Sequence, residues 1–258
     1  MIKYIEVKNF YGINDFDCSE IDVFNVLIGR EELNLQKLMY AVIRSMEKYH
    51  RGDDIRSMSE IICKGLRENF KIKKIGELVK DKNKPLHFKI ITEDGIVEFE
   101  FTNRAKNKIK NLKTSMERPR ESNSVFLPET DVLRDYQGIF RSRDIEHNLV
   151  FDNRSYELAK ALGYFPHNPD TFTPMFCKGY IELNGLGGGE WKYKENGQTI
   201  AVKDLDEKTK KMAMIDRLIS NGYLKSNSVI FINGIKAKEL EEFKEISDRT
   251  NIQMFVSC

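Results

Sequence analysis

The residues best placed to do chemistry follow an apolar run near the start of the chain. Residues 21–29 read IDVFNVLIG, the pattern of a buried central strand ending in glycine, and residues 33–46 carry apolar side chains at helical spacing. A strand, a glycine and a helix in this order form the frame of a phosphate loop, because backbone amides and a helix N-terminus stabilise anionic oxygens. Gly29, Arg30 and Lys37 are therefore candidate phosphate contacts, although we favour Arg30 and Lys37 as surface charges near the start of a helix.

The loop itself departs from the phosphate-binding pattern G-x-x-x-x-G-K-S/T. Counting from Gly29 places Asn34 at the second glycine, Leu35 at the lysine and Gln36 at the hydroxyl position. Without the glycine the amides cannot close around a phosphate, leucine supplies no charge, and glutamine is a poorer ligand for a hard metal than a small hydroxyl group. The spacing therefore predicts a phosphate frame without its binding groups.

The remaining chain alternates strands and helices. The patterns predict a first strand at residues 2–7, a hairpin at 86–101 with an Asp-Gly turn, and hairpins between residues 179 and 202. Further segments follow at 124–128 (strand), 131–142 and 153–162 (helices), 204–221 (helix), 228–232 (strand), 236–248 (helix) and 252–256 (strand). The strand-helix-strand ending predicts a parallel sheet with helical crossovers.

Composition excludes several classes of protein. The 258 residues carry 42 Lys and Arg against 40 Asp and Glu, so the formal net charge of +2 does not indicate a protein that coats nucleic acid or a membrane surface. The four cysteines are far apart and show no metal-ligand spacing, and no run approaches about 18 apolar residues. We expect no metal site and no membrane partner, and we predict a cytoplasmic protein.

A basic stretch occupies residues 103–123. Seven basic residues there face two acids, and apolar residues are scarce. One interpretation is an arm that contacts nucleic-acid phosphates through Arg104, Lys106, Lys108, Lys110 and Lys113. We favour the simpler interpretation of a mobile solvated loop or an exposed helix.

Several stretches taken together resemble a known family. IKYIEVKNFYGINDFD, FNVLIGR, KLMYAV, SVFLPETDVL, MAMIDRLISNGYLKSNSVIFI and IQMFVSC occur in the order typical of the ABC-type ATPases of the bacterial AAA/OLD-like group, distant relatives of RecF and SMC heads. The resemblance implies an α/β, P-loop NTPase-like fold: a mixed sheet with helices on both faces, opened by a hairpin. It also implies a single domain over residues 1–258, with the basic loop at 103–123 and a helical and hairpin insertion at about 130–203.

The groups that such ATPases use for catalysis are replaced. Where the family has an Asp-Glu pair after the VIFI strand, for magnesium and for the attacking water, this chain has Asn233-Gly234. The signature helix begins VKDLDEKTKK, where Asp204 or Asp206 fits a helix cap but would repel a phosphate. After the last strand, Cys258 stands where relatives continue into a Thr-His pair. We therefore name no catalytic residue, and count Gly29, Arg30, Lys37 and Asn233 as a vestigial nucleotide site.

These replacements favour a catalytically inactive ABC-ATPase-like protein that works as a binding or regulatory subunit. Its expected partner is a protein, either itself as a dimer or an active ATPase relative, and it needs no cofactor. Analogy with the family suggests phage defence, counter-defence or DNA maintenance. Two alternatives stay open: a weak ATPase that binds ATP and Mg²⁺ through Lys37, Arg30 and Glu239, and a nucleic-acid-binding module built on the basic stretch.

Overall fold

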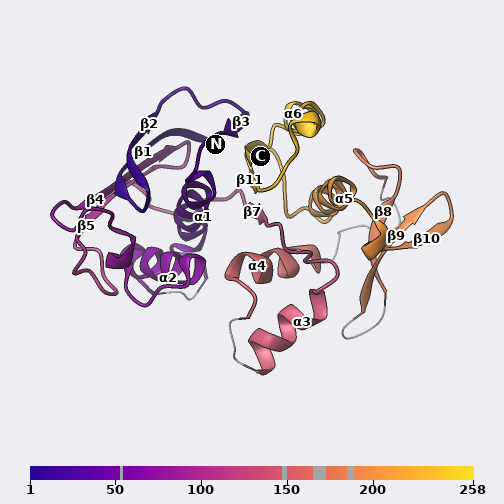
Figure 1. Ribbon diagram of the computed structural model, residues 1–258, viewed down its shortest axis with the longest axis horizontal. Coiled ribbons are helices and arrows are strands. Elements are labelled where there is room, and N and C mark those ends of the chain that lie inside the picture. Colours follow the sequence, from indigo (N-terminus) through magenta and orange to yellow (C-terminus); the bar gives the residue numbers. More distant parts are fainter. Residues whose placement is uncertain (53–54, 147–149, 165–172, 185–188) are drawn as a thin grey trace.

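The computed structural model describes all residues except 53–54, 147–149, 165–172 and 185–188 (Figure 1). The described residues form a five-stranded antiparallel sheet, a four-stranded parallel sheet and a three-stranded antiparallel sheet, with helices packed between and around them. Parallel and antiparallel strands therefore lie in different sheets.

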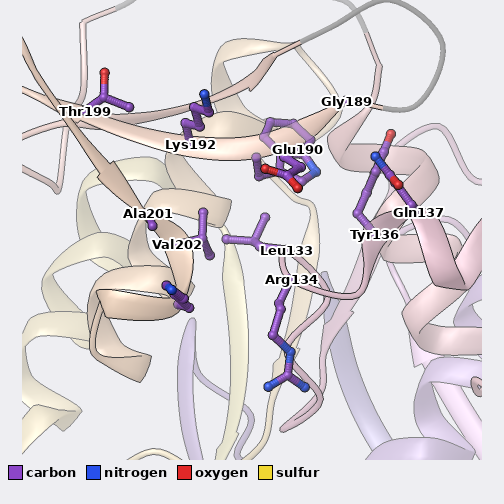
Figure 2. Close-up of a pocket in the computed structure, with 12 residues that line it drawn as sticks. Leu133, Arg134, Tyr136, Gln137, Gly189, Glu190, Lys192, Thr199, Ala201 and Val202 are labelled. Carbon is purple, nitrogen blue, oxygen red and sulfur yellow. The ribbon is translucent and has the colours of Figure 1, made fainter.

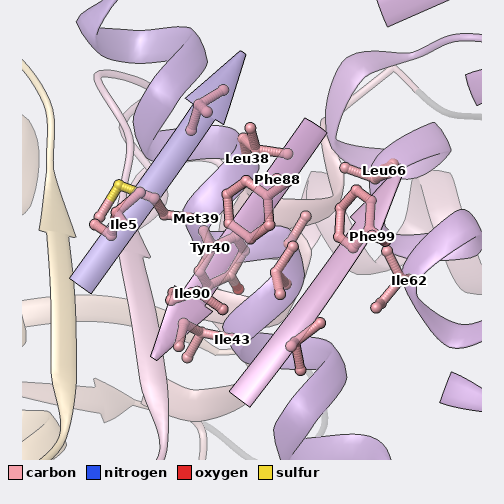
Figure 3. Close-up of a cluster of buried hydrophobic side chains, with 14 of the residues drawn as sticks. Ile5, Leu38, Met39, Tyr40, Ile43, Ile62, Leu66, Phe88, Ile90 and Phe99 are labelled. Carbon is pink, nitrogen blue, oxygen red and sulfur yellow. The ribbon is translucent and has the colours of Figure 1, made fainter. Parts of the chain in front are cut away.

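The antiparallel sheet of the N-terminal half has the order β2-β1-β4-β5-β6. Its strands are β1 (Ile2–Phe10), β2 (Ile13–Cys18), β4 (Leu86–Thr92), β5 (Ile96–Phe101) and β6 (Asn111–Thr114). Helices α1 (Glu32–Lys48) and α2 (Met58–Phe70) pack against it, with the short helix η1 (Ile75–Leu78) nearby. Figure 3 shows Leu38, Met39 and Ile43 of α1 among Ile5, Phe88 and Ile90 of the sheet.

The parallel sheet has the order β3-β12-β11-β7 and divides the molecule into two cores. Its strands are β3 (Phe24–Leu27), β7 (Ser124–Leu127), β11 (Val229–Ile232) and β12 (Gln253–Ser257). Because successive side chains of a strand point to opposite faces, Phe126, Phe231 and Phe255 join the core around α1, whereas Ile230 and Val256 join the second core.

The second core lies between the parallel sheet and the C-terminal helices. It is formed by α3 (Tyr136–Phe140), α4 (Asn153–Leu162), α5 (Glu207–Ser220), α6 (Leu240–Thr250) and the sheet of β8 (Tyr180–Asn184), β9 (Glu190–Glu195) and β10 (Gln198–Ala201). The short helices η2 (Arg141–Ile145), η4 (Val202–Asp204) and η5 (Ala237–Glu239) connect these elements. Helices therefore cover both faces of the parallel sheet, as expected from the sequence.

The expected central strand at residues 21–29 is instead a short edge strand. Within the described part of the chain, the strand spans only Phe24–Leu27 and pairs with β12 alone, and it is partly exposed rather than buried. The Asn25 side chain donates to the carbonyl oxygen of Asp22 at 2.7 Å and accepts from the Asp22 amide at 3.0 Å. This local turn replaces strand pairing at the start of the apolar run, so the expectation of a buried central strand was wrong.

The basic stretch is only partly solvated. Residues Asn111–Thr114 form strand β6, which pairs with β5. Ile109 and Met116, on either side of this strand, are buried. Arg120 is fully buried: its Nη1 lies 3.4 Å from Glu47 Oε1, and its Nη2 donates to the Asn227 carbonyl oxygen at 2.7 Å. The expected solvated loop or helix is therefore corrected to an edge strand flanked by anchored segments.

Candidate functional site

The loop between β3 and α1 places backbone amides at the start of a helix, but a carboxylate of the chain already binds there. Gly29 has φ +148°, a conformation that favours glycine, and its amide donates to Glu32 Oε2 at 2.8 Å. A carboxylate in the first turn of a helix is stabilised by the exposed amides and the helix dipole. Glu32 therefore occupies the Gly29 amide that a phosphate oxygen would need.

The three positions aligned with the missing phosphate-loop groups have structural roles. Asn34 donates to Glu31 Oε2 at 2.7 Å, and Leu35 is buried in the first core. Gln36 is fully buried and donates through Nε2 to the carbonyl oxygens of Ile232, at 3.2 Å, and Phe255, at 3.0 Å. The residue at the hydroxyl position thus ties α1 to the end of β11 and to the middle of β12.

Lys37 lies apart from Gly29 and Arg30. Burial lowers the pKa of Lys37, and the neighbouring Arg154 guanidinium lowers it further. Gly29 and Arg30 line a cleft beside β3, and Lys37 is absent from its lining. The structure therefore brings together two of the four residues that the sequence assigned to a vestigial nucleotide site.

Asn233, the fourth of these residues, is held by neighbours at the end of β11. Its Oδ1 accepts from the Ser257 hydroxyl at 2.8 Å. Lys211 of α5, which is buried, donates through Nζ to the carbonyl oxygens of Asn233 at 2.8 Å and Gly234 at 2.9 Å. Burial lowers the pKa of Lys211. The Lys211 side chain thus binds the carbonyl oxygens of the two residues that follow β11. At these positions relatives are expected to have the acids that bind magnesium.

Glu239, the residue considered for a rescue of activity, lies in η5 and accepts from the Lys236 amide at 3.2 Å. Among the described residues, no group of three or more His, Cys, Asp or Glu is arranged to hold a metal ion.

The cleft beside β3 has a volume of about 720 Å³ and an acidic lining. It lies between β2, β3 and the start of α1, over the apolar floor made by residues such as Met39 and Phe255. Arg30 is the single cationic side chain among the described lining residues of the cleft. Four carboxylates line the same cleft: Asp15, Glu20, Glu31 and Glu32. This charge opposes a nucleoside triphosphate, which brings several negative charges of its own.

Sequence reasoning missed the acidic character of this cleft. The alternating acids of INDFDCSE were a signal, but they come from β2 and the segment after it. Because β2 and β3 belong to different sheets, only the packing of the two sheets places these acids beside β3.

The five candidate nucleic-acid contacts are all exposed. Lys113 pairs with Glu98 at 3.2 Å, and no ion pair is recorded among the described residues for Arg104, Lys106, Lys108 or Lys110. The backbone beside them is anchored, because the Ile109 amide donates to Ser59 Oγ of α2 at 2.9 Å. These side chains are absent from the acidic cleft, so the two charged surfaces are separate.

A second cavity, of about 560 Å³, lies between β9, β10 and the segment before α3 (Figure 2). Buried Trp191 and Tyr136 contribute to its lining, their rings meeting edge to face with centroids 5.5 Å apart. The charged side chains of Arg134 and Lys192 also line it. No motif in the sequence pointed to this cavity.

The arrangement of the sheets, α1 and the strand ends defines the class of fold: that of an ABC-type ATPase head. The structure of RecF with ATPrS, a recombination mediator protein of the RecFOR pathway, superposes with a TM-score of 0.51 at 13% identity, over 100% of this chain and 92% of that one. The Smc head domain from Pyrococcus furiosus, with an extended coiled coil and bound to the C-terminal domain of ScpA, gives 0.50 at 11% identity, over 100% and 89% of the two chains. This similarity establishes the fold.

By sequence, no protein-family profile and no curated protein matches the chain. None of the helices in the described residues combines the length and apolar character needed to span a membrane.

Proposed function

We propose that this chain is an ABC-ATPase-head-like protein that does not hydrolyse ATP and acts as a binding or regulatory subunit for another protein. The observation that carries the proposal is the 2.8 Å contact between the Gly29 amide and the Glu32 carboxylate. A phosphate would have to displace this carboxylate from the helix start and then lie beside it.

The end of β11 supports the same conclusion. Phosphoryl transfer depends almost entirely on positioned charges and metal ions, so an enzyme that lacks them has little else with which to lower the barrier. Here Lys211 donates to the carbonyl oxygens after the strand, and Asn233 accepts from Ser257. We propose that the head fold is kept as a scaffold for protein contacts.

Measurements with ATP and Mg²⁺ test the proposal directly. We expect no magnesium-dependent hydrolysis above background and no thermal stabilisation by millimolar ATP. If turnover is found and falls in Lys37→Ala or Glu239→Gln, the weak-ATPase alternative replaces the proposal. Lys203→Ala, an exposed lysine outside the cleft, is the matched control for Lys37→Ala.

The partner we propose is a second copy or an active relative, in a setting such as phage defence, counter-defence or DNA maintenance. Purification from native cells, with the mass of the complex in solution, tests this. A companion with an intact phosphate loop and acid pair supports an accessory subunit. A purely monomeric protein without a companion contradicts it.

Nucleic-acid binding is a second candidate function, favoured by the exposed cations of the basic stretch. Arg104, Lys106, Lys108 and Lys110 project from a backbone anchored on α2 and β5. DNA affinity should then fall steeply with salt and drop when Lys106, Lys108 and Lys110 are changed to alanine. Affinity that does not depend on salt, or on these lysines, excludes this function.

A further inference from the structure

The strand β3 has an open edge. Among the residues that the structure describes, it is the last strand of the parallel sheet and pairs on one side only, with β12. The Met254 amide donates to the Val23 carbonyl oxygen at 2.7 Å, so the backbone groups of Val23 face β12. Because these groups alternate along a strand, those of Phe24 and Val26 face the open side. An unpaired edge of this kind is a template for another strand.

Apolar side chains extend along the same edge. Ile28 is 91% exposed and Val26 is 36% exposed, both among the lining residues of the acidic cleft. An extended peptide beside β3 would cover these side chains while its backbone paired with the strand. Exposed aliphatic side chains next to an unpaired edge mark a surface for contact with another chain.

Acids surround this edge. Asp15 on β2 and Glu20 just after it are exposed and line the cleft. Glu31 is held in place by Asn34, and the turn after β1 approaches it so closely that a Cβ added to Gly12 would lie 2.1 Å from Glu31 Oε1. The occupant must therefore bring positive charge.

We propose that the cleft binds an extended segment of a protein partner that alternates apolar with basic residues and adds as a strand to the open edge of β3. The apolar residues cover Val26 and Ile28, and the lysines or arginines face the carboxylates across the cleft. This inference deepens the proposed function and rests on it, because it assigns the cleft beside the loop to a protein segment instead of a nucleotide.

The test uses a fluorescein-labelled peptide of four Lys-Val repeats, with four Glu-Val repeats as the charge-reversed control, measured by fluorescence anisotropy on the full chain. We expect the Lys-Val peptide to bind and the Glu-Val peptide not to bind. Replacing both Asp15 and Glu20 by lysine should weaken binding by about tenfold or more, since two charge contacts near a surface are together worth about 1.4 kcal/mol.

Two variants separate strand addition from simple charge attraction. Val26→Pro removes an outward amide without touching the ladder to β12, and should weaken binding while the charges remain. Glu117→Lys with Asp204→Lys makes the same change in net charge at exposed positions outside the cleft, and should leave binding unchanged. In amide exchange measured by NMR, Phe24 and Val26 should gain protection when the peptide binds.

Two outcomes overturn the inference: no binding of the Lys-Val peptide, or binding insensitive to Val26→Pro and without protection of Phe24 and Val26. Either can occur while ATP is neither bound nor hydrolysed, and then the inactive-head proposal stands alone. Hydrolysis of ATP, in contrast, overturns the proposed function itself.

Discussion

Glu157 is a partly buried carboxylate held between two cations of α1. Its Oε2 lies 2.6 Å from Arg44 Nη2, and its Oε1 lies 3.1 Å from Lys48 Nζ. Burial alone would raise the pKa of Glu157, but the charges of Arg44 and Lys48 outweigh it and hold the pKa at about 2. The ion pairs link α4 to α1 and so join the two cores.

We predict that Glu157→Gln lowers the free energy of unfolding at pH 7 by about 3 kcal/mol, because a carboxyl pKa lowered from 4.5 to about 2 corresponds to about that much stabilisation of the folded state. Arg44 keeps its second partner, Glu47, in the variant. A folded-state pKa below the ordinary value gives stability that is present above about pH 4.5 and is lost as the pH falls toward 2. Urea unfolding at pH 7 and at pH 3 checks this. The difference between wild type and variant should shrink at pH 3, and a difference that stays constant contradicts the assignment.

Lys37 and Lys211 show how far the contacts of a single side chain can be predicted from the sequence. Spacing after Gly29 predicted Lys37 as a candidate, yet the turn of α1 carries it toward Arg154. Lys211 contacts Asn233, which is 22 positions away in the sequence, because α5 packs across the end of β11. Local spacing cannot reveal such a contact, which depends on how two elements pack.

Gln36 connects three elements through one side chain. Its Nε2 donates from within α1 to the carbonyl oxygens of Ile232, at the end of β11, and Phe255, in the middle of β12. Its Oε1 has no hydrogen-bond partner among the described residues. These two hydrogen bonds of Nε2 fix the distance between the start of α1 and the strands β11 and β12. The fold can therefore form without a small hydroxyl side chain at position 36, because glutamine supplies a structural contact there.

We predict that Gln36→Leu lowers the free energy of unfolding by about 2 kcal/mol, because two carbonyl oxygens lose a buried donor while the relieved Oε1 compensates only in part. Chemical denaturation followed by circular dichroism measures the change. Gln198→Leu, the same substitution at an exposed position of β10, should change stability by less than about 0.5 kcal/mol. Equal effects of the two substitutions would show that the buried hydrogen bonds contribute nothing.

At the level of elements, periodicity predicted most of the fold. The helix α1, the β4–β5 hairpin, α4 and the parallel β11-α6-β12 ending lie close to the expected ranges. Of the two expected cap residues, Asp204 and Asp206, it is Asp206 that forms the N-cap of α5. Its carboxylate accepts from the Thr209 amide at 2.9 Å. The order of strands in the sheet was harder to predict, because an apolar run such as residues 21–29 is compatible with both a central strand and an edge strand.

The whole molecule is organised around one parallel sheet that serves two cores. Phe231 stacks on Phe255 and Phe126 on the α1 side, while its neighbours Ile230 and Ile232 pack in the second core. The chain has a single tryptophan, Trp191, and it lies in the second core. Its fluorescence therefore reports on one core while far-ultraviolet circular dichroism reports on both.

We predict that Phe231→Ala lowers the free energy of unfolding by about 4 kcal/mol, the usual cost of removing a buried aromatic side chain. Because the sheet is common to both cores, the transition followed by Trp191 fluorescence should shift as far as the one followed by circular dichroism. If Trp191 keeps its wild-type midpoint, the two cores unfold independently. Phe140→Ala, which removes a partly buried ring that packs against the second core, is the matched control and should cost less.

The acidic residues that line the cleft beside β3 should affect how readily the protein self-associates at high concentration. Bare strand edges with exposed isoleucine tend to join one another and seed aggregates. Two identical molecules that meet along this edge bring like charges together, so each repels its own copies there. Concentrated salt weakens that repulsion, and the purified chain should then self-associate more readily as ionic strength rises.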